Sequence, residues 1–198
     1  MGRRKTYDRD DLIERSMEMF RDHGYAGTST QMLVDTLGVN RYSLYAEFGD
    51  KQTLFDAALE RYFDEVIEPR FSPLEAPEAG IDEVREVFEF YASQADGAAS
   101  GRGCLLCNTA IELGSRDPSG AGFVQRYFQR LSRAFRAALA NAHDAGQLAG
   151  DVDTREEAEF FTASVLGLFV MLRATAPPAT IEHAARAAIR HLDTVRSG

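Results

Sequence analysis

The sequence is poor in cysteine and lacks a long apolar run. Two cysteines in 198 residues are too few for the disulfide framework of a small secreted domain. The most apolar run extends over 13 residues, from Phe160 to Leu172, whereas a membrane-spanning helix needs about 20. The N-terminal residues lead into amphipathic sequence and do not resemble a signal peptide. From these absences we expect a cytoplasmic protein without a membrane segment.

Strand-like alternation and internal repeats are also missing, and helical patterns fill the chain. In the first pattern, Leu12, Ile13, Met17 and Phe20 recur at helical spacing between charged residues. The same reading along the chain predicts helices over residues 10–23, about 29–37, 41–48, 51–68, 81–94, 118–145, about 154–172 and 180–195. The sequence therefore predicts an all-α fold in two parts, residues 1–55 and residues 56–198.

Capping residues and prolines mark the expected helix ends. The stretches TSTQ and TREE read as capping boxes, with Thr28 and Thr154 as the N-cap residues. Asn40 and Asp50 are expected to cap the helices that follow them. Pro69 and Pro73 are expected to interrupt the chain after the fourth helix.

Negative charge is in excess but unevenly distributed. Residues 1–55 hold 8 Lys or Arg against 9 Asp or Glu, a net charge of −1, within a total of −9. The acidity therefore belongs to residues 56–198. Arg3–Lys5 and Arg9 form a short basic arm at the N-terminus. The overall acidity therefore does not exclude a DNA contact made by a small N-terminal surface.

The first part has the pattern of a helix-turn-helix, two short helices joined by a glycine-containing turn after a supporting helix. On the second short helix, Leu44 and Phe48 lie together on the inner face. Tyr42 and Ala46 lie opposite them, and this outer face is narrow enough for a DNA major groove about 12 Å wide. The residues beside them are Ser43 and Tyr45 on the flanks and Asn40 and Arg41 at the tip. A three-helix packing unit that binds no DNA would produce the same pattern.

Arg41 and Lys51 carry the charges that suit DNA in this segment. The Arg41 guanidinium can pair bidentately with guanine. Lys51 begins the fourth helix, where its charge and the helix dipole favour a phosphate. On these residues alone, a DNA-binding face and a packing unit that binds no DNA are both open.

Residues 11–55 also resemble the TetR family of bacterial transcriptional regulators. The resemblance is carried by LIERSMEMF and by HGYAGTSTQMLVDTLGVNRYSLYAEFGDKQTLF. It implies a homodimeric, ligand-responsive repressor that binds a palindromic operator. It implies phosphate contacts from Thr28, Ser29, Thr30, Tyr45 and Lys51, and base contacts from Arg41, Tyr42, Ser43 and Ala46. Tyr42 and Ala46 depart from the residues usual in the family, so an operator sequence cannot be borrowed from relatives.

The second part is rich in aromatic residues that are predicted to lie inside a helical bundle. Helical bundles lodge ligands between their helices, so we expect a hydrophobic or aromatic effector there. The expected ligand-binding residues are Phe63, Phe88, Tyr91, Cys107, Asn108, Phe123, Tyr127 and Leu168. The alternative is that each aromatic residue belongs to the ordinary core.

Small residues recur on the last two helices, including Ala163 and Gly167 on one and Ala184 and Ala187 on the other. They allow close helix approach, and a long apolar helix needs cover. With the family resemblance, this pattern predicts a four-helix dimer interface. Packing within one chain is the alternative.

Cys104 and Cys107 have Cys-x-x-Cys spacing, but no βαβ pattern or further metal ligand accompanies them. Two buried cysteines are the simplest interpretation. Arg102 and a helix start at Cys104 would favour a reactive thiolate. Cys104 is therefore a candidate thiol switch, and a redox- or electrophile-sensing regulator is an alternative function.

Two further classes of protein are weighed against a DNA-binding regulator. The histidines are scattered and show no catalytic or metal-binding spacing, so neither an enzyme nor a cofactor is expected. The second class is a helical interaction module that does not bind DNA.

Overall fold

The computed structural model describes residues 7–114 and 118–197. Within these ranges the chain is all-helical, and its one β contact is an isolated bridge between Leu148 and Arg196. The helices are α1 (Arg9–Gly27), α2 (Thr30–Leu37), α3 (Arg41–Phe48), α4 (Lys51–Tyr62), α5 (Glu68–Phe71), α6 (Ile81–Ser93), α7 (Leu105–Glu112), α8 (Pro118–Asp144), α9 (Thr154–Arg173) and α10 (Pro178–Thr194). This confirms the predicted fold class.

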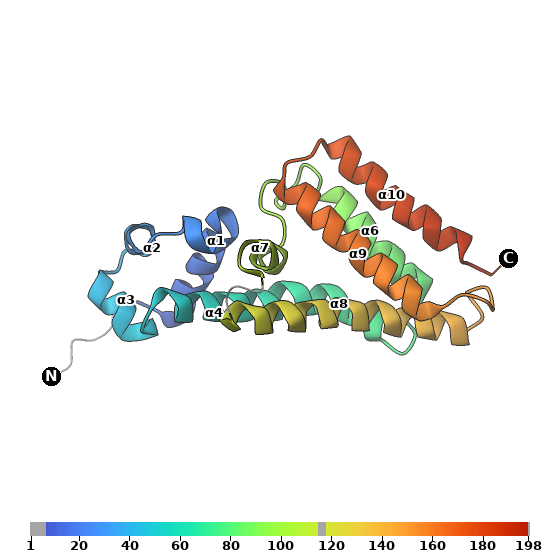
Figure 1. Cartoon of the computed structure of the whole chain (residues 1–198), viewed down its shortest axis with the longest axis horizontal. Helices are drawn as coiled ribbons and strands as arrows, with labels where there is room; N and C mark the ends of the chain where they lie inside the picture. The colour runs from blue at the N-terminus through green and yellow to red at the C-terminus, as the bar shows by residue number, and fades with distance from the viewer. Residues whose placement is uncertain (1–6, 115–117, 198) are drawn as a thin grey trace.

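The helices form two groups joined by α4, α7 and α8 (Figure 1). Helices α1, α2 and α3 gather at the end of the molecule that holds the N-terminus. Helices α6, α9 and α10 lie side by side at the other end, over α8. Helix α7 lies between α1 and α9 and contacts both. The same arrangement places the predicted helix-turn-helix away from the aromatic bundle.

The first group folds as its sequence pattern predicts. Leu12, Phe20, Leu33 and Leu44 are buried in one core, at most 2% exposed. Gly38 ends α2 in the left-handed conformation, with φ of 68°. A residue with a side chain would be strained at this φ, so the glycine sets the tight turn into α3.

Three predicted helix ends are wrong in detail. The N-cap of α2 is Ser29, whose hydroxyl accepts the Met32 N–H at 3.1 Å, and the N-cap of α9 is Asp153 rather than Thr154. Pro69 does not end the helical run. A π-helical turn, Phe63–Ile67, precedes it, and α5 continues through Pro69 to Phe71 before a 3₁₀ turn, Ser72–Glu75. Proline is tolerated there because it occupies the first turn of α5 and the π turn shifts the preceding carbonyl pattern.

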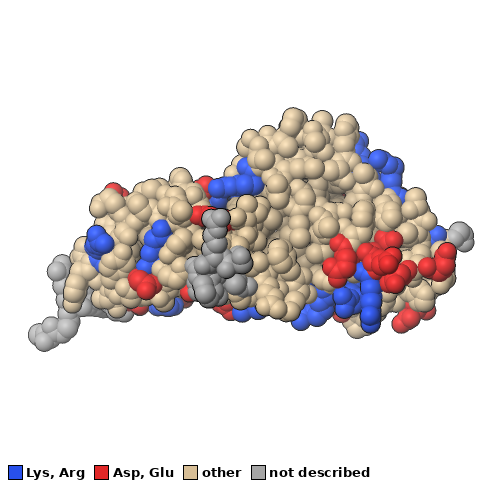
Figure 2. Space-filling view, in the orientation of Figure 1, with Lys and Arg blue, Asp and Glu red and all other residues tan. Residues whose placement is uncertain are grey.

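Charged side chains of both signs are visible at each end of the molecule in Figure 2. On the face shown, the largest acidic cluster lies toward the end that holds the C-terminus, with basic side chains beside it. Of the helices within residues 7–114 and 118–197, none combines the length and apolar composition needed to span a bilayer.

Candidate DNA-binding surface and ligand pocket

Helix α3 presents an outer face of the predicted composition. The Asn40 side chain accepts the Ser43 N–H at 2.8 Å, which starts the helix, while Leu44 and Phe48 are buried. Tyr42 is 84% exposed on the opposite side. Burial of one face therefore holds α3 rigidly and leaves the Tyr42 ring free for a partner.

The residues beside Tyr42 form a shallow surface hollow. It is lined by Arg41, Tyr42, Tyr45 and Ala46. The Arg41 guanidinium lies 5.4 Å from the centre of the Tyr45 ring, and the Tyr45 hydroxyl is 2.8 Å from the Thr30 hydroxyl. These contacts orient the Arg41 and Tyr45 side chains and link α3 to the start of α2.

Thr28 does not lie on this surface, which corrects its predicted role. Its side chain is fully buried, and its hydroxyl donates to the Gly24 carbonyl at 2.7 Å. The threonine therefore closes the end of α1 instead of reaching a phosphate. Ser29 and Thr30, the next two residues, remain at the surface or partly exposed.

Lys51 is engaged inside the chain. Its ammonium group donates to the Tyr25 carbonyl at 2.6 Å and lies 4.1 Å from the centre of the Tyr25 ring. Partial burial lowers the pKa of Lys51, and the opposing charge of Glu112 acts in the other direction. In this conformation Lys51 ties the start of α4 to the end of α1.

The sequence interpretation missed the residues that brace α3 from behind. The Tyr7 hydroxyl donates to a Glu47 carboxylate oxygen at 3.3 Å, and Arg9 pairs with Glu47 at 3.7 Å. The Arg9 guanidinium also lies 5.2 Å from the centre of the Phe48 ring. The basic character of Arg9 was visible in the sequence, but its use as a brace was not. Arg3–Lys5 lie outside the described residues.

The predicted ligand site is largely a packed core. Phe88 is fully buried, with the rings of Phe135 and Phe161 at centroid distances of 6.2 and 5.6 Å, and Tyr127 is fully buried as well. Phe88 and Tyr127 therefore pack in the core and do not line the cavity described next. The other predicted residues that do not line the cavity described next are Phe63, Cys107, Asn108, Phe123 and Leu168.

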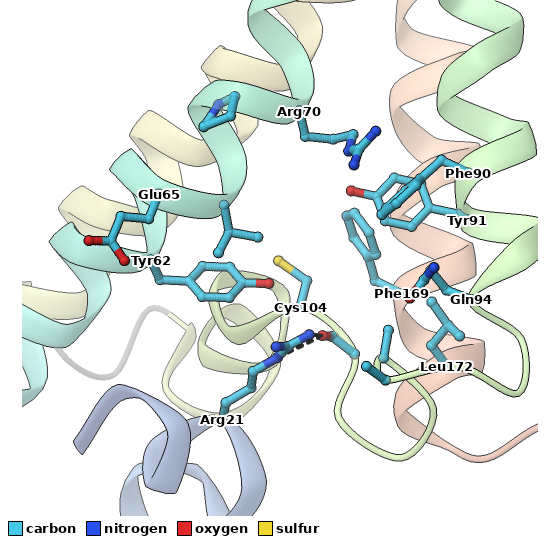
Figure 3. Close-up of a pocket in the computed structure, with 15 residues that line it drawn as sticks. Arg21, Tyr62, Glu65, Arg70, Phe90, Tyr91, Gln94, Cys104, Phe169 and Leu172 are labelled. Atoms are coloured by element: carbon cyan, nitrogen blue, oxygen red, sulfur yellow. Dashed lines mark hydrogen bonds between the residues drawn. The ribbon is translucent and has the colours of Figure 1, made fainter. Parts of the chain in front are cut away.

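A cavity of about 400 Å³ lies beside this core, and we call it the Tyr91 cavity. Its walls come from α1, the α4–α5 segment, α6, the loop of residues 97–103 and α9 (Figure 3). The lining residues are Arg21, Tyr62, Glu65, Val66, Pro69, Arg70, Phe90, Tyr91, Gln94, Ala98, Ala99, Gly103, Cys104, Phe169 and Leu172. Tyr91 is thus the one residue of the predicted ligand set that lines this cavity. No local sequence signal marks Arg21 or Arg70 as cavity residues, because both lie on helices with ordinary amphipathic patterns.

The surroundings of Cys104 do not favour a thiolate. Burial raises the pKa of Cys104, and hydrogen bonds from Tyr127 and neighbouring backbone groups oppose that effect only in part. The thiol lies 3.4 Å from the Tyr127 hydroxyl. Arg102, the cation expected to activate it, instead pairs with Glu18 and Asp22. The structure therefore contradicts the charge argument for a reactive Cys104.

In the described part of the chain, His, Cys, Asp and Glu form no group suited to a metal ion.

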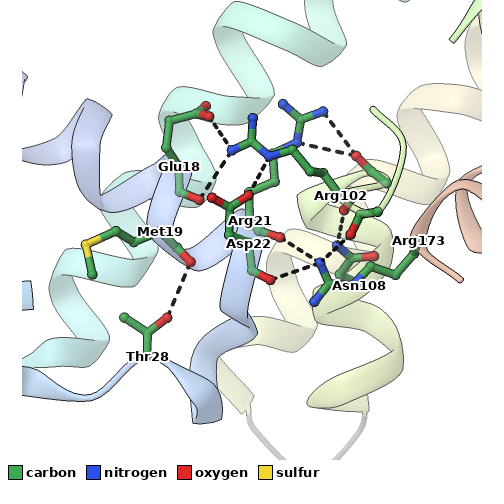
Figure 4. A network of polar contacts seen from close by, with 10 residues as sticks. Glu18, Met19, Arg21, Asp22, Thr28, Arg102, Asn108 and Arg173 are labelled. Carbon is green, nitrogen blue, oxygen red and sulfur yellow. Dashed lines mark hydrogen bonds and ion pairs between the residues drawn. The ribbon is translucent and has the colours of Figure 1, made fainter. Parts of the chain in front are cut away.

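The end of α1 is held by side chains from the second part of the chain (Figure 4). Arg102 pairs with Glu18 and Asp22, and Arg173 donates to the Arg21 and Asp22 carbonyls at 3.0 and 3.2 Å. We call these contacts, together with those of Glu112, the α1 joint.

Glu112 completes the α1 joint from the last turn of α7. Its carboxylate accepts the Tyr25 and Ala26 N–H groups at 2.9 and 2.6 Å. A Cβ at Gly24 would lie 2.6 Å from a Glu112 oxygen, and Gly24 has φ of 75°. Both facts explain why glycine is needed where α1 bends.

Comparison with known proteins places both parts of the chain. Residues 12–58 match the family described as bacterial regulatory proteins, tetR family, and residues 80–188 match the tetracyclin repressor-like C-terminal domain. The HTH-type transcriptional regulator YezE of Bacillus subtilis is 33% identical over 177 residues, which covers 89% of this chain and 91% of YezE. The chain belongs to the TetR family of bacterial regulators.

Other TetR-family proteins are similar over most of the chain. The HTH-type transcriptional repressor ComR of Escherichia coli is 27% identical over 87% of this chain and 82% of its own length. A cysteine mutant of the TetR-family regulator CifR, solved with a 26-base-pair operator DNA, has a TM-score of 0.82 and 26% identity, covering 96% of this chain and 98% of CifR. A TetR-family regulator from Chloroflexus aurantiacus matches with a TM-score of 0.82 and 22% identity, covering 96% of each chain.

Family membership decides between the classes of protein. TetR-family members are DNA-binding transcription factors and not enzymes, so the enzyme and the interaction module without DNA binding are both set aside. The chain is a ligand-responsive regulator whose partners are double-stranded operator DNA and a second copy of itself.

Proposed function

We propose that this chain is a repressor that holds a palindromic operator through two copies of α3 and is released when a small molecule enters the Tyr91 cavity. The observation that carries this proposal is the 84% exposure of Tyr42 on a recognition helix whose other face is buried. ComR, a relative named as a repressor, supports the direction of regulation. Action on chromosomal DNA implies a cytoplasmic location.

The base-reading face comprises Arg41, Tyr42, Ser43 and Ala46. Tyr42 offers its ring edge to a thymine methyl group or its hydroxyl to an acceptor, and Arg41 offers two donors to guanine. The phosphate contacts come from Ser29, Thr30, Asn40, Tyr45 and Lys51, with Lys51 turning from the Tyr25 carbonyl to do so. We assign these contacts to residues 1–55, and effector binding and dimerisation to residues 56–198.

The homodimer interface is proposed on the outer faces of α9 and α10. Phe160 and Val170 of α9 are 41% and 43% exposed, although they are large and apolar. A Cβ at Gly167, between them, would meet no atom within 4 Å. An apolar stripe with open space above it is suited to a second copy of the same helix.

Release from DNA requires that the cavity act on the helix-turn-helix, and the α1 joint provides the connection. The loop of residues 97–103 lines the cavity and carries Arg102, which pairs with α1. A ligand that displaces this loop changes the support of α1 and so the spacing of the two α3 helices. This is a population shift between a DNA-competent and a released state.

The test is a gel-shift titration with the DNA upstream of this protein's own gene. We expect specific binding that competitor DNA of scrambled sequence does not remove. Arg41→Ala and Tyr42→Ala should weaken it, whereas Arg133→Ala, at an exposed position on α8 outside the proposed interface, should not. Equal binding of operator and scrambled DNA by the folded dimer would contradict the proposal.

A further inference from the structure

Two arginines at the Tyr91 cavity have no carboxylate partner within the described residues. The Arg70 guanidinium lies 3.3 Å from the centre of the Phe90 ring, and no hydrogen bond or ion pair engages it there. Arg21 donates to the Gly103 carbonyl at 3.2 and 3.4 Å and lies over the Tyr62 ring. By contrast, the buried Arg130 pairs with both Glu68 and Glu75. A cavity with two such cations favours an anionic occupant.

Acidic residues do not cancel this positive charge. The charged residues lining the cavity are Arg21, Arg70 and Glu65. Glu65 pairs with Arg61 at 3.0 Å, and its carboxylate points away from Arg70 in Figure 3. The lining therefore carries a net positive charge within a chain whose net charge is −9.

The rest of the cavity is apolar and aromatic. Phe90, Tyr91, Phe169 and Leu172 form the wall opposite Tyr62 (Figure 3). The Tyr91 and Phe169 rings meet edge to face at a centroid distance of 4.7 Å. Such a wall accepts a flat or branched hydrocarbon body, whereas an inorganic anion would leave it unfilled.

Resting on the function proposed above, we propose that the effector is an amphipathic carboxylate, with its apolar body against the aromatic wall and its carboxylate on Arg70. The planar guanidinium fork binds a carboxylate through two parallel hydrogen bonds, and partial removal from water strengthens them. Arg21 adds a second positive charge from another side of the cavity.

Tyr91 supplies a further donor for the same carboxylate. Burial raises the pKa of Tyr91, and the positive charges of Arg70 and Arg21 act in the opposite direction. The hydroxyl therefore stays protonated at neutral pH and can donate to an anion.

The position of Arg21 connects this ligand to DNA binding. Arg21 belongs to α1, and its guanidinium holds the Gly103 carbonyl of the loop that also carries Arg102. An anion in the cavity competes with that carbonyl for Arg21. Binding therefore loosens the contact between the loop and α1, next to the α1 joint.

Calorimetric titration of the full-length dimer tests the ligand class. The probes are benzoate, 2-naphthoate and octanoate, each paired with its neutral amide of nearly the same shape. We expect at least one carboxylate to bind about tenfold or more tightly than its amide. Arg70→Gln should remove that preference, and Tyr91→Phe should reduce it. Arg155→Gln, the matched control at an exposed arginine that does not line the cavity, should leave it unchanged.

The outcomes separate this inference from the proposed function. Equal binding of amide and carboxylate, an Arg70→Gln variant that keeps the preference, or no carboxylate binding at millimolar concentration would overturn the anionic effector. Operator binding by the ligand-free dimer would still stand as support for the regulator. If a carboxylate binds through Arg70 yet leaves operator affinity unchanged, the ligand class holds and the proposed release mechanism fails. If Arg70→Gln does not fold, the comparison of carboxylate with amide on the native protein decides.

Discussion

The proposed DNA-binding surface and the Tyr91 cavity are built in opposite ways. The surface comes from one short stretch, residues 29–51, with each side chain placed by helical periodicity and local caps. The cavity takes its walls from residues as distant as Arg21 and Leu172. A contiguous surface keeps its geometry while the rest of the molecule moves, whereas a cavity built from several elements changes when any of them shifts. This contrast is suited to a regulator, which needs a rigid surface to read DNA (the reader, here the α3 face) and a deformable ligand site (the sensor, here the Tyr91 cavity).

The contrast also assigns a role to the residues between the two sites. Arg102, Glu112 and Arg173 reach α1 from elements that surround or adjoin the cavity, and Lys51 ties α4 to the same end of α1. Under the proposed mechanism, these contacts transmit a movement of the cavity walls to α1 and leave the α3 face unaltered.

The largest effect on operator affinity is expected from a substitution outside both the α3 face and the Tyr91 cavity. Gly167→Glu places charge and bulk on the outer face of α9, where open space now lies above the glycine. We expect light scattering to report monomers and operator affinity to fall by about 100-fold or more, because each half-site then binds alone. Gly150→Glu, at an exposed glycine that also has open space around it, is the control. A dimeric Gly167→Glu variant would place the interface elsewhere.

The next prediction compares two phenylalanines of α6, one in the core and one at the Tyr91 cavity. Phe88 is fully buried among rings, whereas Phe90 is half-buried at the cavity beside Arg70. Phe88→Ala should lower the free energy of unfolding by about 3–5 kcal/mol, since it removes a buried ring and leaves a void. Phe90→Ala should cost less stability but weaken the binding of 2-naphthoate. Urea denaturation and calorimetry measure both, and a reversal of the two phenotypes would restore the aromatic core as the ligand site.

This pair of phenylalanines shows where prediction from sequence succeeds and where it stops. Periodicity identified the buried face of α6, including Phe88 and Tyr91, because burial is a local property of an amphipathic helix. Periodicity cannot distinguish a ring that fills the core from one that borders a void. That difference depends on how α1, α6 and α9 meet, and no local pattern encodes it.

Caps and charged partners show the same limit on a smaller scale. Asn40 and Asp50 were predicted correctly as N-caps. Thr28 was predicted as the N-cap of α2, but Ser29 holds that position because Thr28 is buried against the end of α1. Lys51 and Arg102 were predicted from their charge to face a phosphate and a thiol. Both instead engage groups of α1, because tertiary contacts supplied acceptors that the sequence did not reveal.

A smaller effect on operator binding is expected from a substitution on the α3 face itself. Tyr42→Ala removes the most exposed part of the α3 face and should cost about 1–3 kcal/mol of operator binding, concentrated at one base position. Fluorescence anisotropy with operator variants measures the loss. Tyr42→Phe keeps the ring and separates a methyl contact from a hydroxyl contact. Because Tyr42 is not packed on the core, thermal unfolding should be unchanged; a loss of stability instead of specificity would mean that the side chain supports the fold.

The smallest effect is expected from chemical labelling of the two cysteines. It tests whether either thiol could act as a redox switch. Burial raises the pKa of Cys104 above its usual value and that of Cys107 to about 12. Only a small fraction of either thiol is ionised at pH 7, so a neutral alkylating probe should label the native protein slowly. The rate should rise about tenfold per pH unit while the pH stays below the thiol pKa, because the thiolate is the nucleophile.

Cys104 lines the Tyr91 cavity and Cys107 does not, so Cys104 should react first, and bound 2-naphthoate should protect it. Mass spectrometry of Cys104→Ser and Cys107→Ser variants assigns the sites, with urea-unfolded protein as the fast reference. Rapid labelling of Cys104 at neutral pH would show that burial does not control its reactivity and would return the thiol switch to consideration.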